Sequence, residues 1–216
     1  MVLWEITYGS SDEYRTISLD GTTGAVLAML SVWAENRQLP SITAMDGYPM
    51  AEAKAEEWDP GAVLVKIDTN SVCVPHQTSL SQDGKSPVWT YWFAIANPSN
   101  AQESKRSFYV AVCGGELAGF EEGYPGETHK VQGAAEDWII DSLQAVEIAE
   151  QNGGQQARAR NLSMIIASLF LVRPANGPAA SKNVIWLISY QDLDTFPVEA
   201  FSVFIDGTTG QLIGTQ

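Results

Sequence analysis

The chain has 216 residues, of which 45% are hydrophobic, and its formal net charge is -14. The hydrophobic content is that of a globular protein with a packed core and argues against a disordered chain. The acidic charge repels phosphate groups, so nucleic acid and anionic membrane surfaces are poor partners. The sequence has no run of about eighteen apolar residues, and charged residues interrupt positions 1–30. We therefore expect neither direct membrane insertion nor a signal peptide in this chain.

The first segment predicts strands joined by a tight turn. "WEITY" (Trp4–Tyr8) and "EYRTISLD" (Glu13–Asp20) both alternate apolar and polar residues, which is typical of strands with one buried face. In the "DGTTG" that follows, Asp20 can accept a hydrogen bond from a backbone N–H two residues on, and we expect Gly21 and Gly24 to supply positive φ. We interpret Asp20 as a turn former, because it has no partner for acid–base chemistry.

A linker, a helix and further strands are predicted next. Pro49 suits the first position of a helix that continues through good helix formers and stops at Asp59-Pro60. The apolar segments "AVLVKI" and "VWTYWFAI" then indicate strands. The hairpin in "YVAVCGGELAGF" has a shorter turn, with Cys113 in the place that Asp20 takes in the first hairpin.

A second helix and a long apolar strand precede the end of the chain. Asp141 is the expected N-cap, paired with Gln144 three residues later, and the helix is expected to end at Gly153-Gly154. Its face toward a sheet is expected to include Leu143, Val146, Ile148 and Ala149. The nearly continuous apolar run "SMIIASLFLV" predicts a central strand that is buried on both sides.

The end of the chain repeats its beginning. "WLISY" (Trp186–Tyr190) matches "WEITY" in its Trp, Ile and Tyr, and "DGTTG" recurs at Asp206. A weaker copy lies around Trp89. We therefore predict an α+β fold of repeated modules, each a helix packed on an antiparallel curved sheet. The expected boundaries are a half-unit without a preceding helix at 1–30, linkers at 31–44 and 123–133, and complete units at 45–122 and 134–216.

These segments resemble the PepSY family, small extracytoplasmic modules of bacteria. The resemblance rests on Glu57–Ile67, Asp83–Phe93, Asp141–Gly154 and Ile205–Ile213. It implies a helix on a curved sheet, cystatin-like in general shape, without enzyme activity, in the cell envelope or outside the cell. A peptidase-inhibiting or peptidase-regulating role has been proposed for the family. The half-unit and the turn at Cys113 depart from the family's pattern.

The search for chemistry predicts no catalytic, cofactor-binding or metal site and no cofactor. His76 and His129 are on expected loops without ligand partners, so we interpret them as solvent-exposed. Glu121, Glu122 and Glu127 could hold a hard cation, but they lack the spacing of a calcium loop and are better interpreted as part of a solvated loop. The expected wet face of the first helix carries Glu52, Glu56 and Glu57.

The cysteines and tryptophans have structural interpretations. Cys73 and Cys113 are expected as buried apolar side chains, with a disulfide as the alternative if their strands are neighbours, which would indicate an oxidising compartment. The recurring tryptophans Trp4, Trp89 and Trp186 are expected in the core. Trp33 and Trp92 fit the repeat less well and are the better candidates for binding an aromatic or sugar ligand.

The leading functional hypothesis is a non-enzymatic envelope or secreted protein that acts through protein contacts. Inhibition of a peptidase is one specific form, in which an exposed strand edge pairs with an extended segment. A homo-oligomer formed through the half-unit is also open. The alternative is a carrier or sensor domain with a small-ligand pocket between helix and sheet. An enzyme assembled from distant segments comes third.

Overall fold

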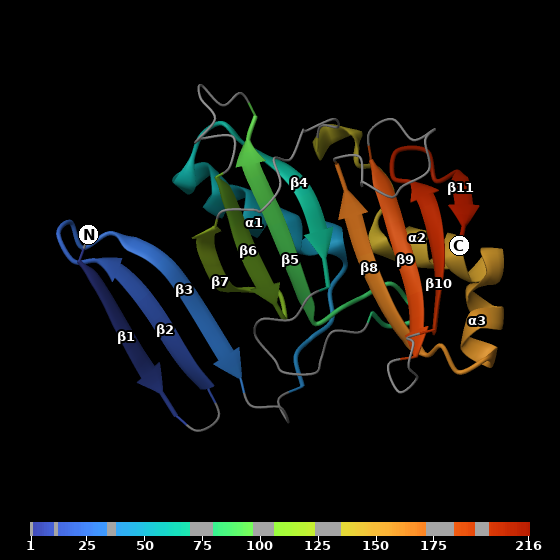
Figure 1. The fold of residues 1–216 in the computed structure, drawn as a ribbon, viewed down its shortest axis with the longest axis horizontal. Coiled ribbons are helices and arrows are strands. Elements are labelled where there is room, and N and C mark those ends of the chain that lie inside the picture. The colour runs from blue at the N-terminus through green and yellow to red at the C-terminus, as the bar shows by residue number, and fades with distance from the viewer. Residues whose placement is uncertain are drawn as a thin grey trace.

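The computed structural model describes residues 2–10, 13–33, 38–69, 80–96, 106–123, 135–171, 184–192 and 199–216. Its strands form one antiparallel sheet in the order β1-β2-β3-β7-β6-β5-β4-β8-β9-β10-β11 (Figure 1). The strands are β1 Leu3–Gly9, β2 Glu13–Asp20, β3 Val26–Trp33, β4 Ala62–Asp68, β5 Val88–Ile95, β6 Ser107–Cys113, β7 Glu116–Gly123, β8 Met164–Phe170, β9 Ile185–Asp192, β10 Glu199–Asp206 and β11 Leu212–Thr215.

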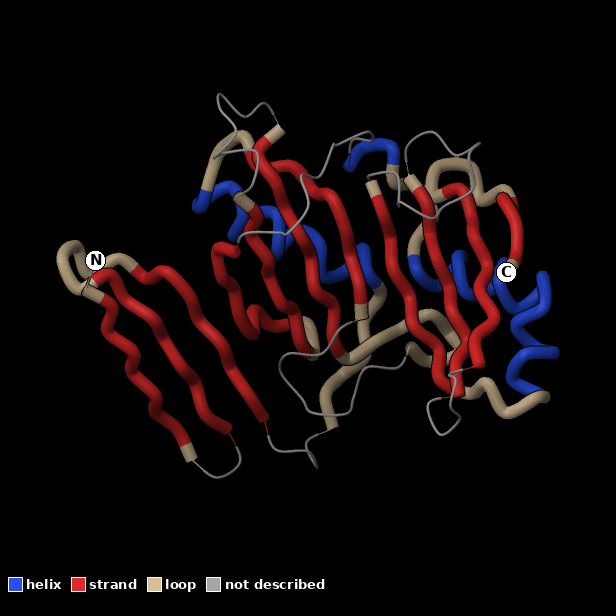
Figure 2. The backbone as a smooth tube through the Cα atoms, viewed as in Figure 1, coloured by secondary structure: helices blue, strands red, loops and turns tan. Residues whose placement is uncertain are grey.

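The predicted fold class of repeated helix-on-sheet modules is wrong, because one sheet dominates the molecule and continues from β1 to β11. Two antiparallel pairings join what the sequence analysis separated: β3 pairs with β7, and β4 pairs with β8. Pairing uses backbone N–H and C=O groups that nearly every residue has, so side-chain patterns do not reveal which strand edges meet. Helices α1 and α2 lie on one face of this sheet (Figure 2).

Helix α1 (Ala44–Trp58) begins before the predicted start at Pro49, which lies inside the helix. Thr43 is the N-cap: its hydroxyl accepts a hydrogen bond from the Asp46 N–H at 3.3 Å, and an Asp46 carboxylate oxygen accepts from the Thr43 N–H at 3.1 Å. This reciprocal pair satisfies donors that a helix start leaves unpaired, so it decides where the helix begins. The residues that α1 buries against the sheet are small: Ala44, Gly47, Ala51 and Ala55.

Helix α2 (Ser142–Ala149) confirms the predicted N-cap, since the Gln144 side chain accepts from the Asp141 N–H at 3.1 Å. Its regular part ends at Ala149 rather than at the predicted glycines. A wide π-helical turn, Glu150–Gly154, leads into α3 (Gln155–Ala159), and Gly153 supplies the positive φ of 116° at the kink.

The buried face of α2 differs from the prediction at its first position. Leu143 is 41% exposed, while Ser142, Ala145, Val146 and Ala149 are buried. Strand β8 occupies the predicted central position, between β4 and β9. Alternate residues of β8 are fully buried and the others half-buried, so the prediction that both of its faces are buried is wrong.

Both "DGTTG" segments form the predicted turns. The Asp20 carboxylate accepts from the Thr22 and Thr23 N–H groups at 2.7 and 3.1 Å, and Asp206 accepts from the equivalent threonines at 2.9 Å each. Gly24 and Gly210 both have φ of 74°, as predicted. The predicted positive φ at Gly21 is wrong: a Cβ there would come within 2.6 Å of the Trp4 indole, so close packing explains this glycine.

One row of side chains crosses the helix-bearing face from edge to edge, because directly paired residues of an antiparallel sheet share a face. The row is Ile6, Ile17, Met29, Phe120, Val110, Tyr91, Ile67, Leu169, Trp186 and Ile205. Tyr91 and Trp186 are fully buried, whereas Ile6 is 47% exposed. The core therefore lies beneath α1 and α2 and runs out toward β1. In the part of the chain that the structure describes, no helix is long and apolar enough to cross a membrane.

Candidate protein-binding face

The helix-bearing face of the sheet is uncovered at β1–β3. Trp4, Ile6 and Tyr8 of β1 are 60%, 47% and 50% exposed, and Val26 of β3 is 49% exposed. We call these four side chains the open face. They lie on the side that α1 covers further along the sheet, because Ile6 pairs with Ile17, and Ile17 pairs with Met29, which packs against the main core. The open face is thus an extension of the core that no described helix covers (Figure 1).

Strands β9–β11 have the register of β1–β3. Trp4 and Ile6 pair with the residues one and three positions before Asp20, and Trp186 and Ile188 pair with those one and three positions before Asp206. A register shift also falls at the same place before each aspartate. Yet Trp186, Ile188 and Tyr190 are all 0% exposed. The same backbone arrangement therefore carries a covered face at one end of the sheet and an open face at the other.

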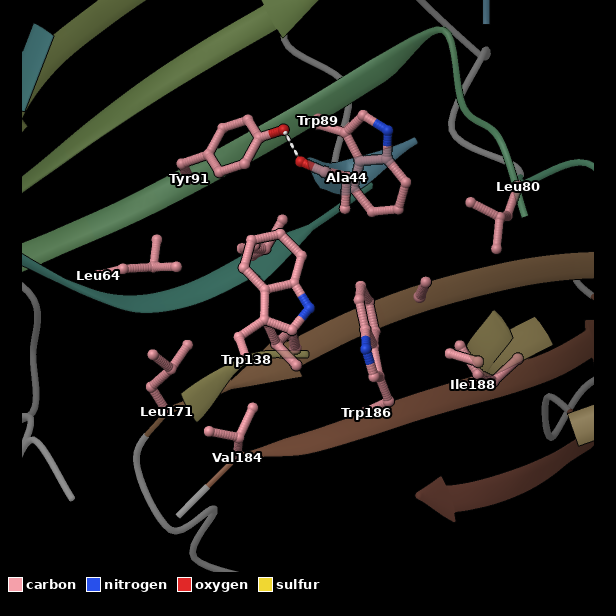
Figure 3. Close-up of a cluster of buried hydrophobic side chains, with 14 of the residues drawn as sticks. Ala44, Leu64, Leu80, Trp89, Tyr91, Trp138, Leu171, Val184, Trp186 and Ile188 are labelled. Atoms are coloured by element: carbon pink, nitrogen blue, oxygen red, sulfur yellow. Dashed lines mark hydrogen bonds between the residues drawn. The ribbon is translucent and has the colours of Figure 1, made fainter. Parts of the chain in front are cut away.

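The buried tryptophans hold the start of each covering helix. The indole N–H of Trp89 donates to the Ile42 carbonyl at 2.9 Å, and that of Trp186 donates to the Ile140 carbonyl at 2.6 Å. Ile42 and Ile140 each come directly before a helix N-cap. Trp89 and Trp186 lie edge to face at 6.4 Å between centroids, with Trp138 beside Trp186 (Figure 3). Among the described residues none accepts a hydrogen bond from the Trp4 indole.

A groove borders the open face where α1 meets β3. Its volume is about 350 Å³, and its walls include Val26 and Leu27 on one side and Lys54 and Trp58 of α1 on the other. Trp58 stacks on Phe108 with 5.1 Å between ring centroids, and the Lys54 ammonium lies 4.2 Å from the Phe120 ring centroid. The groove is therefore apolar at its floor and charged along the α1 side.

The carboxylate of Glu122 lies at the groove and is held in place by hydrogen bonds. Its carboxylate accepts from the Arg106 guanidinium at 2.6 Å and from the Trp58 indole N–H at 3.0 Å. These interactions, the Arg106 hydrogen bond above all, lower the pKa of Glu122 below its ordinary value. Glu122 is consequently an ionised, hydrogen-bonded part of strand β7.

The other predicted acidic residues are placed as follows. Glu121 lies in β7 and accepts from the Tyr109 hydroxyl at 2.8 Å, so both it and Glu122 are strand residues, and their assignment to a loop is wrong. Glu52, Glu56 and Glu57 are exposed on α1, as predicted. Glu127, His76 and His129 lie outside the described residues. The described residues contain no group of three His, Cys, Asp or Glu side chains arranged to hold a metal ion.

Three tryptophans were predicted to lie in the core, and the prediction is confirmed for two of them and wrong for one. Trp89 and Trp186 are fully buried, as expected of core residues, but Trp4 is the most exposed of the large apolar side chains that the structure describes. Trp92 is half-buried on the opposite face of the sheet, where its indole N–H donates to Asp68 at 3.2 Å. The Trp33 side chain lies outside what the structure describes.

Cys113 is disulfide-bonded, and the chain's other cysteine, Cys73, lies outside the described residues. Cys113 sits on the face opposite the helices in a small buried cluster with Val88, Ala111 and Ala118, against which Leu39 packs. The interpretation of Cys113 as a buried residue is confirmed, and the disulfide alternative for it is the correct one.

The open face was missed by sequence reasoning because "WEITY" has the same alternation as the buried "WLISY". The signal available was the helix pattern itself, because one precedes each of the two later copies, whose strand faces are covered. An apolar strand face without a neighbouring helix pattern is a candidate surface for contact with another molecule.

Comparisons with known proteins identify no family for this chain and one distantly similar structure. No family model and no curated protein sequence matches the chain, so the PepSY resemblance stays a prediction. Among solved structures, a "putative lipoprotein" from Clostridium difficile 630 is similar over 84% of this chain and 96% of its own, with a TM-score of 0.46 and 11% sequence identity. A similarity at this level carries no inference about function.

Proposed function

We propose that this protein is a non-enzymatic binding protein that acts through protein contacts made by the open face of β1–β3. The observation that carries the proposal is the exposure of Trp4, Ile6 and Tyr8 side by side on one strand. Contiguous exposed apolar surface is costly in water and marks interaction sites, and aromatic side chains are enriched in such sites.

The surroundings of the open face have the layout of a protein interface. At one end of β1 the Arg15 guanidinium pairs with Glu13 at 3.2 Å, beside a hollow of about 220 Å³ that Tyr8 also lines. Beyond β3, the half-buried Lys54 of α1 pairs with the exposed Glu57. An apolar centre with a polar rim is the usual anatomy of a protein–protein contact.

A location outside the cytoplasm is part of the proposal. The disulfide of Cys113 supports it, since such bonds persist in oxidising compartments and are rare in the cytosol. Regulation of a peptidase is the specific form that the PepSY resemblance favours. In that form, β1 would also offer its unpaired edge, because it is the terminal strand of the sheet.

The test is capture of partners from envelope and secreted fractions on three immobilised proteins: the native chain, a Trp4→Gln/Ile6→Gln variant, and a Leu3→Gln/Tyr14→Gln variant. Leu3 and Tyr14 are 55% and 45% exposed on the opposite face of the same strands, which makes the third protein a matched control. We expect a partner that the native chain and the control retain and the first variant loses. Equal recovery on all three, or no partner above beads alone, would remove the proposal; a peptidase slowed by the native chain would establish the specific form.

The groove between α1 and β3 supports the second candidate, a small-ligand carrier or sensor. Its floor of Phe108 and Phe120 and its volume of about 350 Å³ fit a small apolar or aromatic molecule. A thermal-shift screen of sugars, lipids and amphiphiles checks this function. We expect a true ligand to raise the melting temperature of the native chain and not of a Leu27→Arg variant; no stabilisation by any compound would exclude it within the screened classes.

A further inference from the structure

We propose that the partner of the open face presents an amphipathic α-helix with a stripe of small residues, which packs on Trp4, Ile6 and Tyr8 as α2 packs on Trp186, Ile188 and Tyr190. This inference rests on the proposed function and specifies the partner's chemistry. The motivating observation is the shared register of β1–β3 and β9–β11, together with the opposite exposure of their equivalent side chains.

The covered parts of the sheet define what fits such a face. The largest fully buried side chains come from the strands, namely Trp89 and Tyr91 under α1, and Trp186 and Tyr190 under α2. The helices contribute mainly alanine, glycine and serine at their buried positions, and Val146 of α2 is the one larger side chain among them. Small residues let the helix axis approach the aromatic rings closely, and Gly47 illustrates this, since a Cβ there would come within 2.4 Å of the Tyr91 hydroxyl. A partner helix over Trp4 and Tyr8 meets the same requirement.

The Trp4 indole N–H gives the contact a polar anchor. Both equivalent tryptophans donate to the carbonyl that directly precedes a helix N-cap. A carbonyl in that position lies outside the helix's own hydrogen-bond ladder, and its oxygen accepts from the tryptophan beside a second donor, the Ser86 N–H at Ile42 and the Trp138 indole N–H at Ile140. We infer that the partner's carbonyl before its N-cap accepts from Trp4, which fixes the direction of the bound helix along β1.

The groove beside α1 sets the position of the bound helix. A helix that covers β1–β3 becomes the next helix after α1 on the same face, and Val26 and Leu27 lie between the two. Lys54, Glu57 and Glu122 line this groove and provide charged partners for polar side chains on the flank of the incoming helix.

A second copy of the chain fits the open face less well. The inner faces of its helices α1 and α2 are already packed on their own part of the sheet, so a contact through the apolar surface of β1 would place one open face against another. That arrangement stacks aromatic side chains on aromatic side chains. It also leaves each Trp4 N–H facing strand carbonyls that mostly pair within the ladder.

The test uses the peptide Ala135–Arg160 of this chain as the probe, because it contains α2 and the Ile140 carbonyl that Trp186 uses. Binding is measured by calorimetry against the native chain and the two double variants, at an ionic strength that screens the acidic charges. We expect the Trp4→Gln/Ile6→Gln variant to bind at least about tenfold more weakly, since it loses two apolar side chains. The Leu3→Gln/Tyr14→Gln variant should bind as the native chain does.

Two readouts report the binding geometry. The Trp4 indole N–H should shift downfield in NMR spectra and exchange more slowly when the peptide binds. The helical circular dichroism of the mixture should exceed the sum of its parts. A peptide with Ala145→Pro, which loses the hydrogen bond from the Ala145 N–H to the Asp141 carbonyl in the first turn of the helix, should bind at least about tenfold more weakly.

Several results would overturn the inference. No binding at about 1 mM peptide, or equal binding by both double variants, removes it. Slowed exchange of the unpaired β1 backbone amides without a change at the Trp4 indole would show strand pairing instead, which leaves the proposed function standing. A concentration-dependent dimer that the Trp4→Gln/Ile6→Gln variant abolishes would assign the open face to a second copy of the chain.

Discussion

Strands β1–β3 and β9–β11 share a register, a turn and a Trp-x-Ile-x-Tyr strand, yet they lie in opposite environments. The turn aspartates accept the same backbone hydrogen bonds, and Gly24 and Gly210 have the same φ of 74°. Trp186 is 0% exposed beneath α2, while Trp4 is 60% exposed. The local backbone is therefore set independently of whether the face it creates is covered.

The difference shows that equivalent residues contribute unequally to the fold. Beneath α2, a tryptophan contributes burial and holds the loop before the helix. On β1 the same residue type is kept at the surface of an acidic chain, where it adds little to the fold. Stability is therefore expected to depend more on the β9–β11 end, whereas the proposed binding uses the β1–β3 end.

The largest expected difference in stability is between the alanine variants of Trp186 and Trp4. We expect Trp186→Ala to lower the free energy of unfolding by about 3–5 kcal/mol, because it leaves a cavity and removes the donor to the Ile140 carbonyl. Trp4→Ala should change it by about 0.5 kcal/mol or less, since an exposed side chain leaves no cavity. Urea unfolding followed by circular dichroism measures both. Losses of equal size would mean that Trp4 is buried in solution.

Substitutions of the turn glycines should have smaller effects on stability than the tryptophan substitutions, and they test the two hairpins at equivalent positions. We expect Gly24→Val and Gly210→Val each to cost about 1–3 kcal/mol, because a β-branched residue fits positive φ badly. The Gly210 variant should lose more, since its Cβ would also contact Ile140 and Ile148 at 3.4 Å, whereas nothing lies within 4 Å of a Cβ at Gly24. Thermal unfolding shows which of the two variants has the lower melting temperature.

Gly214→Val provides the control for the glycine series. Gly214 lies in β11 without a positive φ, and nothing lies within 4 Å of a Cβ placed there. Valine suits a strand, so this variant should melt at the native temperature or above it. Turn variants that melt no lower than Gly214→Val would contradict the assigned turn geometry.

The smallest of the expected effects is the loss of stability at alkaline pH. Burial, and then the hydrogen bond to Glu150, raise the pKa of Tyr190 above its ordinary value of 10.0. The unfolded chain therefore loses this proton first, so the stability that Tyr190 contributes is complete below about pH 10 and is lost as the pH rises further. Melting temperatures between about pH 8 and 11 should fall less steeply for Tyr190→Phe than for the native chain.

Tyr8→Phe is the matched variant for the pH series, because Tyr8 occupies the equivalent position on β1 and is 50% exposed. We expect its melting temperature to follow the native chain throughout the range. An identical decline in the native chain and in Tyr190→Phe would show that ionisation of Tyr190 does not limit stability at high pH.

The sequence by itself determined the local structure. Alternation predicted the strands around Trp4, Trp89 and Trp186, and the aspartate and second glycine of each "DGTTG" predicted its turn. The pair Asp141 and Gln144 predicted the start of α2. These features depend on interactions between residues a few positions apart, so a short window of sequence contains their causes. The start of α1 was missed because Pro49 gave a competing signal to the Thr43 and Asp46 cap.

The tertiary structure alone decided how the strands join and which of their faces are covered. The pairing of β3 with β7 and of β4 with β8 merges the expected modules into one sheet through backbone groups that carry no sequence signature. Trp4 and Trp186 occupy equivalent positions in their strands and hairpins, but α2 packs on Trp186 and no described helix packs on Trp4. Alternation of apolar and polar residues shows that a strand has one apolar face. Whether that face is buried depends on an element from elsewhere in the chain that packs on it.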